Sequence, residues 1–381
     1  MTVSEASVTE ALRPVQDPEL RRSIVDLNMV REVAINRSSV RVLVALTTPA
    51  TNGREELERR VSEAIASLDG VKVVQVDFTL LDDAEREELR KQLHGDPQAS
   101  AGTQQGQGHA EGRAVPFAEP GNHTRVLLCA SGKGGVGKSS VTTNLAVALT
   151  QRGKSVGVVD ADVYGFSIPK MLGIDTDPVL LDQMIIPPES HGVRAMSMGF
   201  FAEEETPIIW RGPMLHKALE QFLTDVFWDE PDYLLVDLPP GTGDISISIA
   251  QYLPRSELYV VTTPQPAAQR VAQRAAYMAH KLNITVRGVI ENMSWFTADD
   301  EKRYELFGSG GGQALADQLD VPLLGQIPLM PQLREGGDVG KPITVANSSA
   351  EASQAFASIA ERIDVELAPT RRTHRELRIT G

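Results

Sequence analysis

A glycine-rich segment between an apolar run and a helical run constrains this chain more than any other feature. Its letters, GKGGVGKS at residues 132–139, satisfy the pattern G-x-x-x-x-G-K-[ST]. Apolar residues 126–128 precede it, and a helical stretch ended by Gly153 follows it. Glycines let backbone N–H groups converge on phosphate oxygens, and the helix adds the positive end of its dipole. The pattern predicts a nucleotide phosphate site; the competing interpretation is a glycine-rich turn with an incidental lysine.

The side chains of this segment have separate predicted roles. Lys138 reaches the β- and γ-phosphates of ATP, and the hydroxyl of Ser139 is a ligand for Mg²⁺. Lys138 is therefore a predicted catalytic residue and Ser139 a predicted metal ligand. The expected phosphate-binding set comprises Gly132, Lys133, Gly134, Gly135, Val136, Gly137, Lys138, Ser139 and Ser140.

Carboxylates follow two later apolar runs. Asp160 and Asp162 come after one predicted strand, and Asp237 ends another. Ligands of parallel sheets bind at the carboxyl ends of the strands, where carboxylates can organise Mg²⁺ and a water molecule. Asp237 is expected to hold Mg²⁺ through water, as a Walker B aspartate does, while Gly241 and Gly243 move with the γ-phosphate. For Asp160 and Asp162 an exposed acidic turn is the alternative.

From Arg125 onward, apolar runs alternate with helical stretches. This alternation is typical of an α/β fold in which a doubly wound, mostly parallel sheet is covered on both faces. The expected strands are Arg125–Ala130, Ser155–Asp160, Tyr233–Asp237, Leu258–Thr262, Val286–Ile290 and Leu323–Gly325.

Residues 1–94 have the pattern of a separate small α/β domain. Hydrophobic periodicity predicts a helix, a strand, a helix and a strand, at residues 4–15, 40–46, 57–68 and 74–78. The whole chain has 381 residues, which is too long for one ordinary core, so two domains are expected.

The remaining segments are a predicted linker and tail. Glycine, glutamine and small polar residues dominate 95–121, which indicates a flexible linker; an ordered loop packed on either domain is the alternative. The ATPase domain is then expected at 122–367. The tail, 368–381, contains four arginines, and we expect a solvated end rather than a binding arm.

Charge and cysteine content limit the partners and the compartment. The formal net charge of −14 disfavours nucleic acid and anionic lipid as partners. Cys129 is the one cysteine, so it cannot form an intrachain disulfide or complete a zinc or iron–sulfur ligand set alone. The N-terminal residues lack a signal-peptide pattern, and no stretch approaches the ~20 apolar residues of a membrane span. A cytoplasmic location is expected.

A second lysine directly after the first glycine makes the segment resemble the deviant Walker A group, which includes MinD, ParA, ArsA and the nitrogenase iron protein. The resemblance implies that Lys133 crosses an ATP-dependent dimer interface and stabilises transition-state charge on the partner's nucleotide. It also implies that Asp162 orients the attacking water, that Asp160 supports the metal shell and that Asn292 contacts the adenine edge. A solvent-facing lysine and a helix-capping or turn asparagine are the alternatives for Lys133 and Asn292.

Further motifs narrow the resemblance to the Mrp/ApbC family, described as iron–sulfur cluster carriers with ATPase activity. These motifs occupy residues 160–165, 210–215, 292–294 and 307–312. In addition, DPE at 17–19 and LTTPA at 46–50 resemble the MIP18-like domain often fused to that family. The resemblance implies an ATP-hydrolysing cluster carrier or assembly factor that works as a homodimer with an apo-protein or assembly-factor client.

One departure from the family pattern concerns the cluster ligands. Family members usually carry Cys-x-x-Cys after Asn-Met-Ser, whereas no cysteine lies between Phe296 and Gly308, and residues 299–301 are acidic. Oxygen ligands suit a soft cluster poorly. Thr51 replaces the usual cysteine of the MIP18-like domain, and Cys129 is expected to be inert packing. A carrier that holds any cluster unusually is therefore the first hypothesis. A metal-free, ATP-gated dimer or scaffold that binds a client protein is the alternative.

Overall fold

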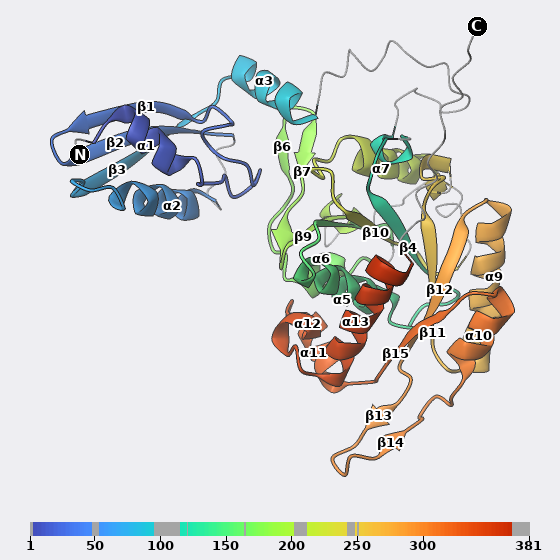
Figure 1. Ribbon diagram of the computed structural model, residues 1–381. Helices are drawn as coiled ribbons and strands as arrows, with labels where there is room; N and C mark the ends of the chain where they lie inside the picture. Colours follow the sequence, from blue (N-terminus) through green and yellow to red (C-terminus); the bar gives the residue numbers. More distant parts are fainter. Residues whose placement is uncertain are drawn as a thin grey trace, which may run out of the picture. The chain divides into compact units, whose positions relative to one another are not determined.

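The computed structural model describes residues 3–47, 53–94, 115–119, 121–163, 165–201, 212–241, 248–249 and 251–367. Figure 1 colours them along the chain. They form two compact units. The first contains the described residues within 1–112 together with 177–188 and 225–229, and the second contains the other described residues. This grouping places two short segments of the expected ATPase region, 177–188 and 225–229, with the first unit.

The first unit is built on a three-stranded sheet in the order β1-β2-β3, with β1 antiparallel and β3 parallel to β2. Its main elements are α1 (Glu5–Leu12), β1 (Val30–Asn36), β2 (Ser39–Leu46), α2 (Arg54–Ala66), β3 (Val73–Leu80) and α3 (Asp83–His94). The four expected elements are present. The sequence did not predict β1, in which charged residues interrupt the alternation, or α3, whose apolar side is limited to Leu89 and Leu93 among mostly charged residues.

The core of the first unit combines helices, strands and an inserted hairpin. Val8 and Leu12 of α1 and Leu57 of α2 are buried against alternate residues of β2. A hairpin of β6 (Val179–Leu181) and β7 (Met184–Ile186) belongs to the same hydrophobic cluster. Such a cluster gives the unit a core of its own, as a separate domain requires.

The second unit is built on an eight-stranded sheet in the order β15-β12-β11-β4-β10-β5-β9-β8. Only β8 is antiparallel to its neighbour. The strands are β4 (Arg125–Ser131), β5 (Val156–Asp160), β8 (Glu189–Ser190), β9 (Val193–Ser197), β10 (Tyr233–Asp237), β11 (Glu257–Thr262), β12 (Thr285–Asn292) and β15 (Leu323–Ile327). All six expected strands are present, so the predicted α/β fold with a mostly parallel sheet is confirmed.

Helices cover both faces of this sheet, as its buried, near-continuous apolar strands require. Figure 1 shows α5, α6 and α13 on one side and α9 and α10 on the other. The helices are α5 (Lys138–Gln151), α6 (Ile168–Leu172), α7 (Gly212–Thr224), α9 (Pro266–Lys281), α10 (Gly311–Leu319), α11 (Pro331–Asp338), α12 (Ile343–Ala346) and α13 (Glu351–Glu361), with the 3₁₀ segments η1 (Pro116–Ala118) and η2 (Met198–Phe201) and the π-helical segment η3 (Arg362–Glu366). Within the described ranges, none of the helices is both long and apolar enough to cross a membrane.

Two smaller features bear on the predictions. Within the segment expected to be a linker, η1 is ordered and Phe117 is buried, so residues 115–119 pack instead of extending freely. After β12, the strands β13 (Phe296–Thr297) and β14 (Arg303–Tyr304) form an antiparallel hairpin. The acidic residues 299–301 lie in the turn of this hairpin.

Candidate functional site

The glycine-rich loop joins β4 to α5 at the carboxyl edge of the sheet. Gly135 and Gly137 have φ values of 80° and 78°, a left-handed conformation that favours glycine. A Cβ atom on Gly132 would lie 2.2 Å from the backbone nitrogen of Ala272 in α9, whereas one on Gly134 or Gly135 would meet nothing within 4 Å. The loop is therefore packed against α9 at its start and open at its centre, as a phosphate cradle must be.

Asn292, at the end of β12, supports the other end of this loop. Its Nδ2 atom donates to the carbonyl of Val136 at 2.9 Å, and a Cβ atom on Gly137 would lie 2.3 Å from Nδ2. The Asn292 side chain is buried, yet its Oδ1 atom has no partner. The amide thus fixes the loop backbone and retains one acceptor for a donor such as an exocyclic amino group. The adenine contact stays a prediction.

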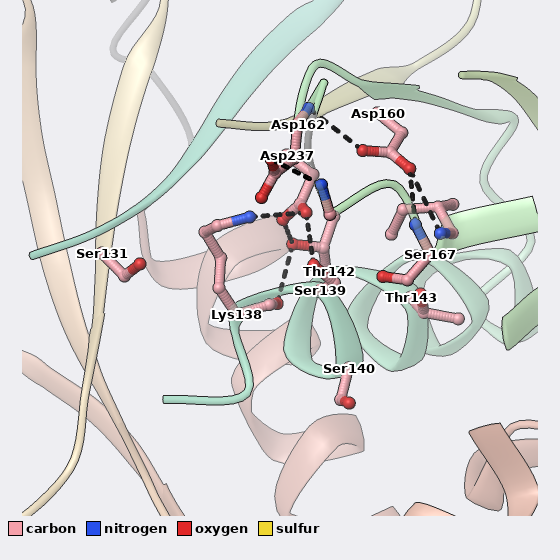
Figure 2. A network of polar contacts seen from close by, with 12 residues as sticks. Ser131, Lys138, Ser139, Ser140, Thr142, Thr143, Asp160, Asp162, Ser167 and Asp237 are labelled. Atoms are coloured by element: carbon pink, nitrogen blue, oxygen red, sulfur yellow. Dashed lines mark hydrogen bonds and ion pairs between the residues drawn. The ribbon is translucent and has the colours of Figure 1, made fainter. Parts of the chain in front are cut away.

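The carboxylate of Asp237 is the centre of the polar network in Figure 2. Lys138 Nζ and Ser139 Oγ each donate to Oδ2 at 2.6 Å, and Thr142 Oγ1 donates to Oδ1 at 2.7 Å. Asp237 is fully buried, and Lys138 is 6% exposed. A buried carboxylate requires a paired charge and hydrogen-bond donors, and here the predicted phosphate lysine supplies the charge.

This arrangement fits a metal-bound nucleotide. The hydroxyl of Ser139 and the carboxylate of Asp237 are hard oxygen donors that meet at one point, and the open backbone at Gly134 and Gly135 lies in the same loop. The sequence places Lys138 and Ser139 in one motif and Asp237 in a later one. The structure brings all three together.

Asp160 lies at the end of β5, next to β10 in the sheet. Burial, together with the charge of Asp237, raises the pKa of Asp160 to about 7. Its oxygens accept from the backbone N–H groups of Ser167 and Ile168 at 3.0 and 3.2 Å and from Ser197 Oγ at 3.1 Å. The carboxylate therefore holds the start of α6 while it lies close to Asp237.

Asp162 lies at the start of the segment between β5 and α6. Its backbone N–H donates to Asp160 Oδ1 at 3.2 Å, and its own Oδ1 accepts from the N–H of Gly165 at 3.1 Å. The side chain is partly exposed. Figure 2 draws it with Asp160 and Asp237, so the structure groups the three predicted carboxylates.

Lys133 and Ser140 point to other partners. Lys133 Nζ donates to Oε1 of Gln265, the residue before α9, at 3.2 Å. Ser140 Oγ donates to the thioether of Met171 in α6 at 3.9 Å. Neither side chain contacts Asp237 in the described network, and Lys133 is held by a contact within this chain.

Sequence reasoning missed two members of this site. Thr142 follows Ser139 by three positions on a helix, a spacing that places both on one face and could have identified it. Gln265 has no comparable signal, because its contact with Lys133 joins residues 132 positions apart.

The predicted glycine Gly241 has a φ of 92° and donates its N–H to the carbonyl of Ser131 at 3.0 Å. Several predicted motif residues lie outside the described residues: 48–51, Tyr164, 210–211 and 242–247, the last including Gly243.

The single cysteine is sealed within the sheet. Cys129 is 0% exposed, pairs with Asp237 in the register of β4 and β10, and has its pKa raised to about 12 by burial. A neutral, inaccessible thiol is a poor metal ligand. Across the part of the chain that the structure describes, no group of three or more His, Cys, Asp or Glu side chains is placed to hold a metal ion.

Two family models match the chain in separate regions. Residues 122–364 match the NUBPL iron-transfer P-loop NTPase model, and residues 5–78 match the model of an iron–sulfur cluster assembly protein. The first match contains every residue of the predicted site. The second covers α1 and the three strands of the first unit, up to residue 78 in β3.

Two curated relatives are similar to this chain over most of their own length. The iron–sulfur cluster carrier protein of Mycobacterium leprae is 46% identical over 94% of this chain and 92% of its own length. That of Bacillus subtilis is 39% identical over 86% and 88%.

Solved structures resemble part of this chain. An ADP-bound nucleotide-binding protein from Archaeoglobus fulgidus matches with a TM-score of 0.53 at 33% identity, over 61% of this chain and 91% of its own. The cell division ATPase MinD from Pyrococcus furiosus matches with a TM-score of 0.50 at 24% identity, over 64% and 99%, which shows the shared fold.

Proposed function

This chain belongs to the family of NUBPL iron-transfer P-loop NTPases, and we propose on that basis that it hydrolyses Mg-ATP to assemble or deliver iron–sulfur clusters. The cluster is the cargo, and the client is an apo-protein or an assembly factor. We further propose that the active form is a nucleotide-dependent homodimer in the cytoplasm. Similarity to cluster-carrier proteins over both units supports the pathway.

The convergence of Lys138 and Ser139 on Asp237 is the observation that carries the ATP-dependent part. The N–H groups around Gly134 and Gly135 would bind the phosphates, and Lys138 would exchange its bond with Asp237 for the β- and γ-phosphate oxygens. Ser139 and Asp237 would hold Mg²⁺, which neutralises charge on the phosphates when it is bound.

The remaining charged groups suggest how hydrolysis is completed. Asp162, which lies at the rim of the network, would orient the attacking water, and Asp160 would support the metal shell. Lys133, which contacts Gln265 and not Asp237, would act on the nucleotide of the partner. A cation that reaches the nucleotide only in the dimer would couple hydrolysis to dimer formation.

A second candidate is a metal-free, ATP-gated dimer or scaffold for a client protein. The burial of Cys129 favours it, because the one thiol of the chain lies within the sheet and holds its proton. In this alternative ATP closes the dimer around a client and hydrolysis releases it.

Anaerobic reconstitution of the full chain with iron, sulfide and Mg-ATP separates the two candidates. The carrier proposal predicts cluster absorption bands that survive in Cys129→Ala, because a buried, protonated thiol is not a ligand. No cluster uptake while ATP hydrolysis stays intact would overturn the carrier role of this chain alone. In that case the scaffold remains.

A further inference from the structure

Thr142 contacts the Asp237 carboxylate from a position to which the phosphate chemistry assigns no role. It lies in α5 one turn beyond Ser139 and is 0% exposed. Its Oγ1 atom is 2.7 Å from Asp237 Oδ1 and 3.0 Å from the carbonyl oxygen of Lys138. Since a hydroxyl has one proton and an ionised carboxylate is the stronger acceptor, the bond to Asp237 is the dominant one.

The two oxygens of Asp237 therefore have different kinds of partner, as Figure 2 shows. Oδ2 accepts from Lys138 and Ser139, the two groups that have ligands of their own in a nucleotide complex. Oδ1 accepts from Thr142, which has no such ligand. A nucleotide can thus take both partners away from Oδ2 but leaves the partner of Oδ1 in place.

The backbone of Asp237 leaves only the side-chain torsions to be set. Asp237 ends a central strand of the sheet, and its carbonyl oxygen accepts from the N–H of Ala161 at 3.0 Å. The terminal torsion of an aspartate is broad, so a carboxylate without a fixed partner can rotate once Lys138 leaves it. A hydrogen bond to Oδ1 that stays in place restricts this rotation.

We propose that Thr142 is a positioning residue that holds Asp237 Oδ1, so that Oδ2 stays directed at the Mg²⁺ position when Lys138 moves to the phosphates. The inference rests on the proposed use of Mg-ATP and adds a residue to it. Outer partners of ligating carboxylates commonly change metal affinity by about 10- to 100-fold when they are removed.

Thr143 offers a matched control within the same helix turn. It is also buried, at 1% exposed, but its hydroxyl donates to the thioether of Met171 at 3.8 Å. Thr142→Val and Thr143→Val therefore remove the same group from neighbouring buried sites. Only the first of these changes alters Asp237. Thr142→Ser restores the hydroxyl without the methyl group.

The test measures binding of a fluorescent ATP analogue to the full chain while MgCl₂ is titrated, with a parallel measurement in EDTA. We expect Thr142→Val to raise the Mg²⁺ concentration for half-maximal binding by about tenfold and to leave affinity in EDTA unchanged. Thr142→Ser and Thr143→Val are expected to behave like the unmodified chain. In an Asp237→Ala background, Thr142→Val is expected to have no further effect.

An unchanged Mg²⁺ requirement in Thr142→Val, or an equal shift in Thr143→Val, overturns the positioning role while the proposed function stands. Nucleotide binding by the unmodified chain that ignores Mg²⁺ overturns the proposed function, and this inference with it. If Thr142→Val does not fold, as judged by circular dichroism, Thr142→Ala is measured against Thr142→Ser by the same criterion.

Discussion

Two carboxylates organise two regions of the second unit, and they differ in burial. Asp237 is fully buried and binds Lys138, Ser139 and Thr142. Glu351, at the start of α13, binds Arg303 at 2.5 Å and accepts from the indole of Trp295 at 3.2 Å, which holds the β13–β14 hairpin. Two of the partners of Asp237, Lys138 and Ser139, are groups that a bound nucleotide would take over.

The second carboxylate, Glu351, contacts side chains that hold the hairpin. Arg303 also lies over the Trp295 ring, 4.5 Å from its centroid, and Thr297 donates to Glu351 at 3.1 Å. The side chain of Arg303 is 60% exposed, so water screens this cluster. The charges at Asp237 are buried, whereas the β13–β14 hairpin is braced by partly exposed side chains. Substitutions should therefore have large effects at the first region and small effects at the second.

Replacement of the phosphate lysine is expected to have the largest effect. Lys138→Ala removes the cation that pairs with Asp237 and that would bind the phosphates, so ATP turnover should be abolished. Phosphate release in the presence of Mg-ATP measures it. Lys154→Ala, an exchange at a surface lysine paired with Asp364, serves as the control. Turnover near the normal rate in Lys138→Ala would show that hydrolysis does not need the pair of Lys138 and Asp237.

The second lysine should separate binding from hydrolysis. Lys133→Ala is expected to spare nucleotide affinity and to lower hydrolysis by about 100-fold, because its contact in its own subunit is Gln265 and its proposed target lies in the partner. Nucleotide titration and phosphate release are measured on the same preparation. Normal hydrolysis by this variant would show that no trans-acting lysine operates here.

The pH dependence of the free energy of unfolding should show how strongly burial beside Asp237 affects Asp160. The pKa of Asp160 is raised from 3.8 to about 7, so the folded chain binds a proton more tightly than the unfolded chain. Stability is therefore expected to fall as pH rises from about 4 to about 7, by a few kcal/mol at most. Denaturant unfolding in EDTA across this range should show a weaker pH dependence in Asp160→Asn. Equal slopes for the two chains would contradict the assignment.

Loss of the hairpin carboxylate should have the smallest effect. Glu351→Ala removes hydrogen bonds of a partly exposed cluster and is expected to cost about 1 kcal/mol or less, with ATP hydrolysis unchanged. Thermal unfolding and limited proteolysis of the hairpin measure it. Glu361→Ala, at the exposed end of the same helix, is the matched control. A loss of activity in Glu351→Ala alone would make the hairpin part of the reaction.

Local patterns in the sequence predicted the parts of the site that are contiguous. The loop from Gly132 to Ser139 carries its own chemistry, and Asp237 could be located because it ends an apolar run. Helix spacing places Thr142 on the same face as Ser139, but it does not show that Asp237 is the partner. Gln265 was missed because its contact with Lys133 joins distant parts of the chain. Strand β9 was missed because Arg194 interrupts its apolar run, and its pairing with β5 appears only in the fold.

The order of residues by itself determined that an apolar strand, a glycine loop and a helix occur in succession, because hydrophobic period and glycine content are local properties. Only the tertiary structure decided which donors the Asp237 carboxylate receives. The order of strands in the sheet places β10 between β4 and β5, beneath the start of α5. Contacts between such distant segments depend on how the sheet and helices pack, which no local pattern records.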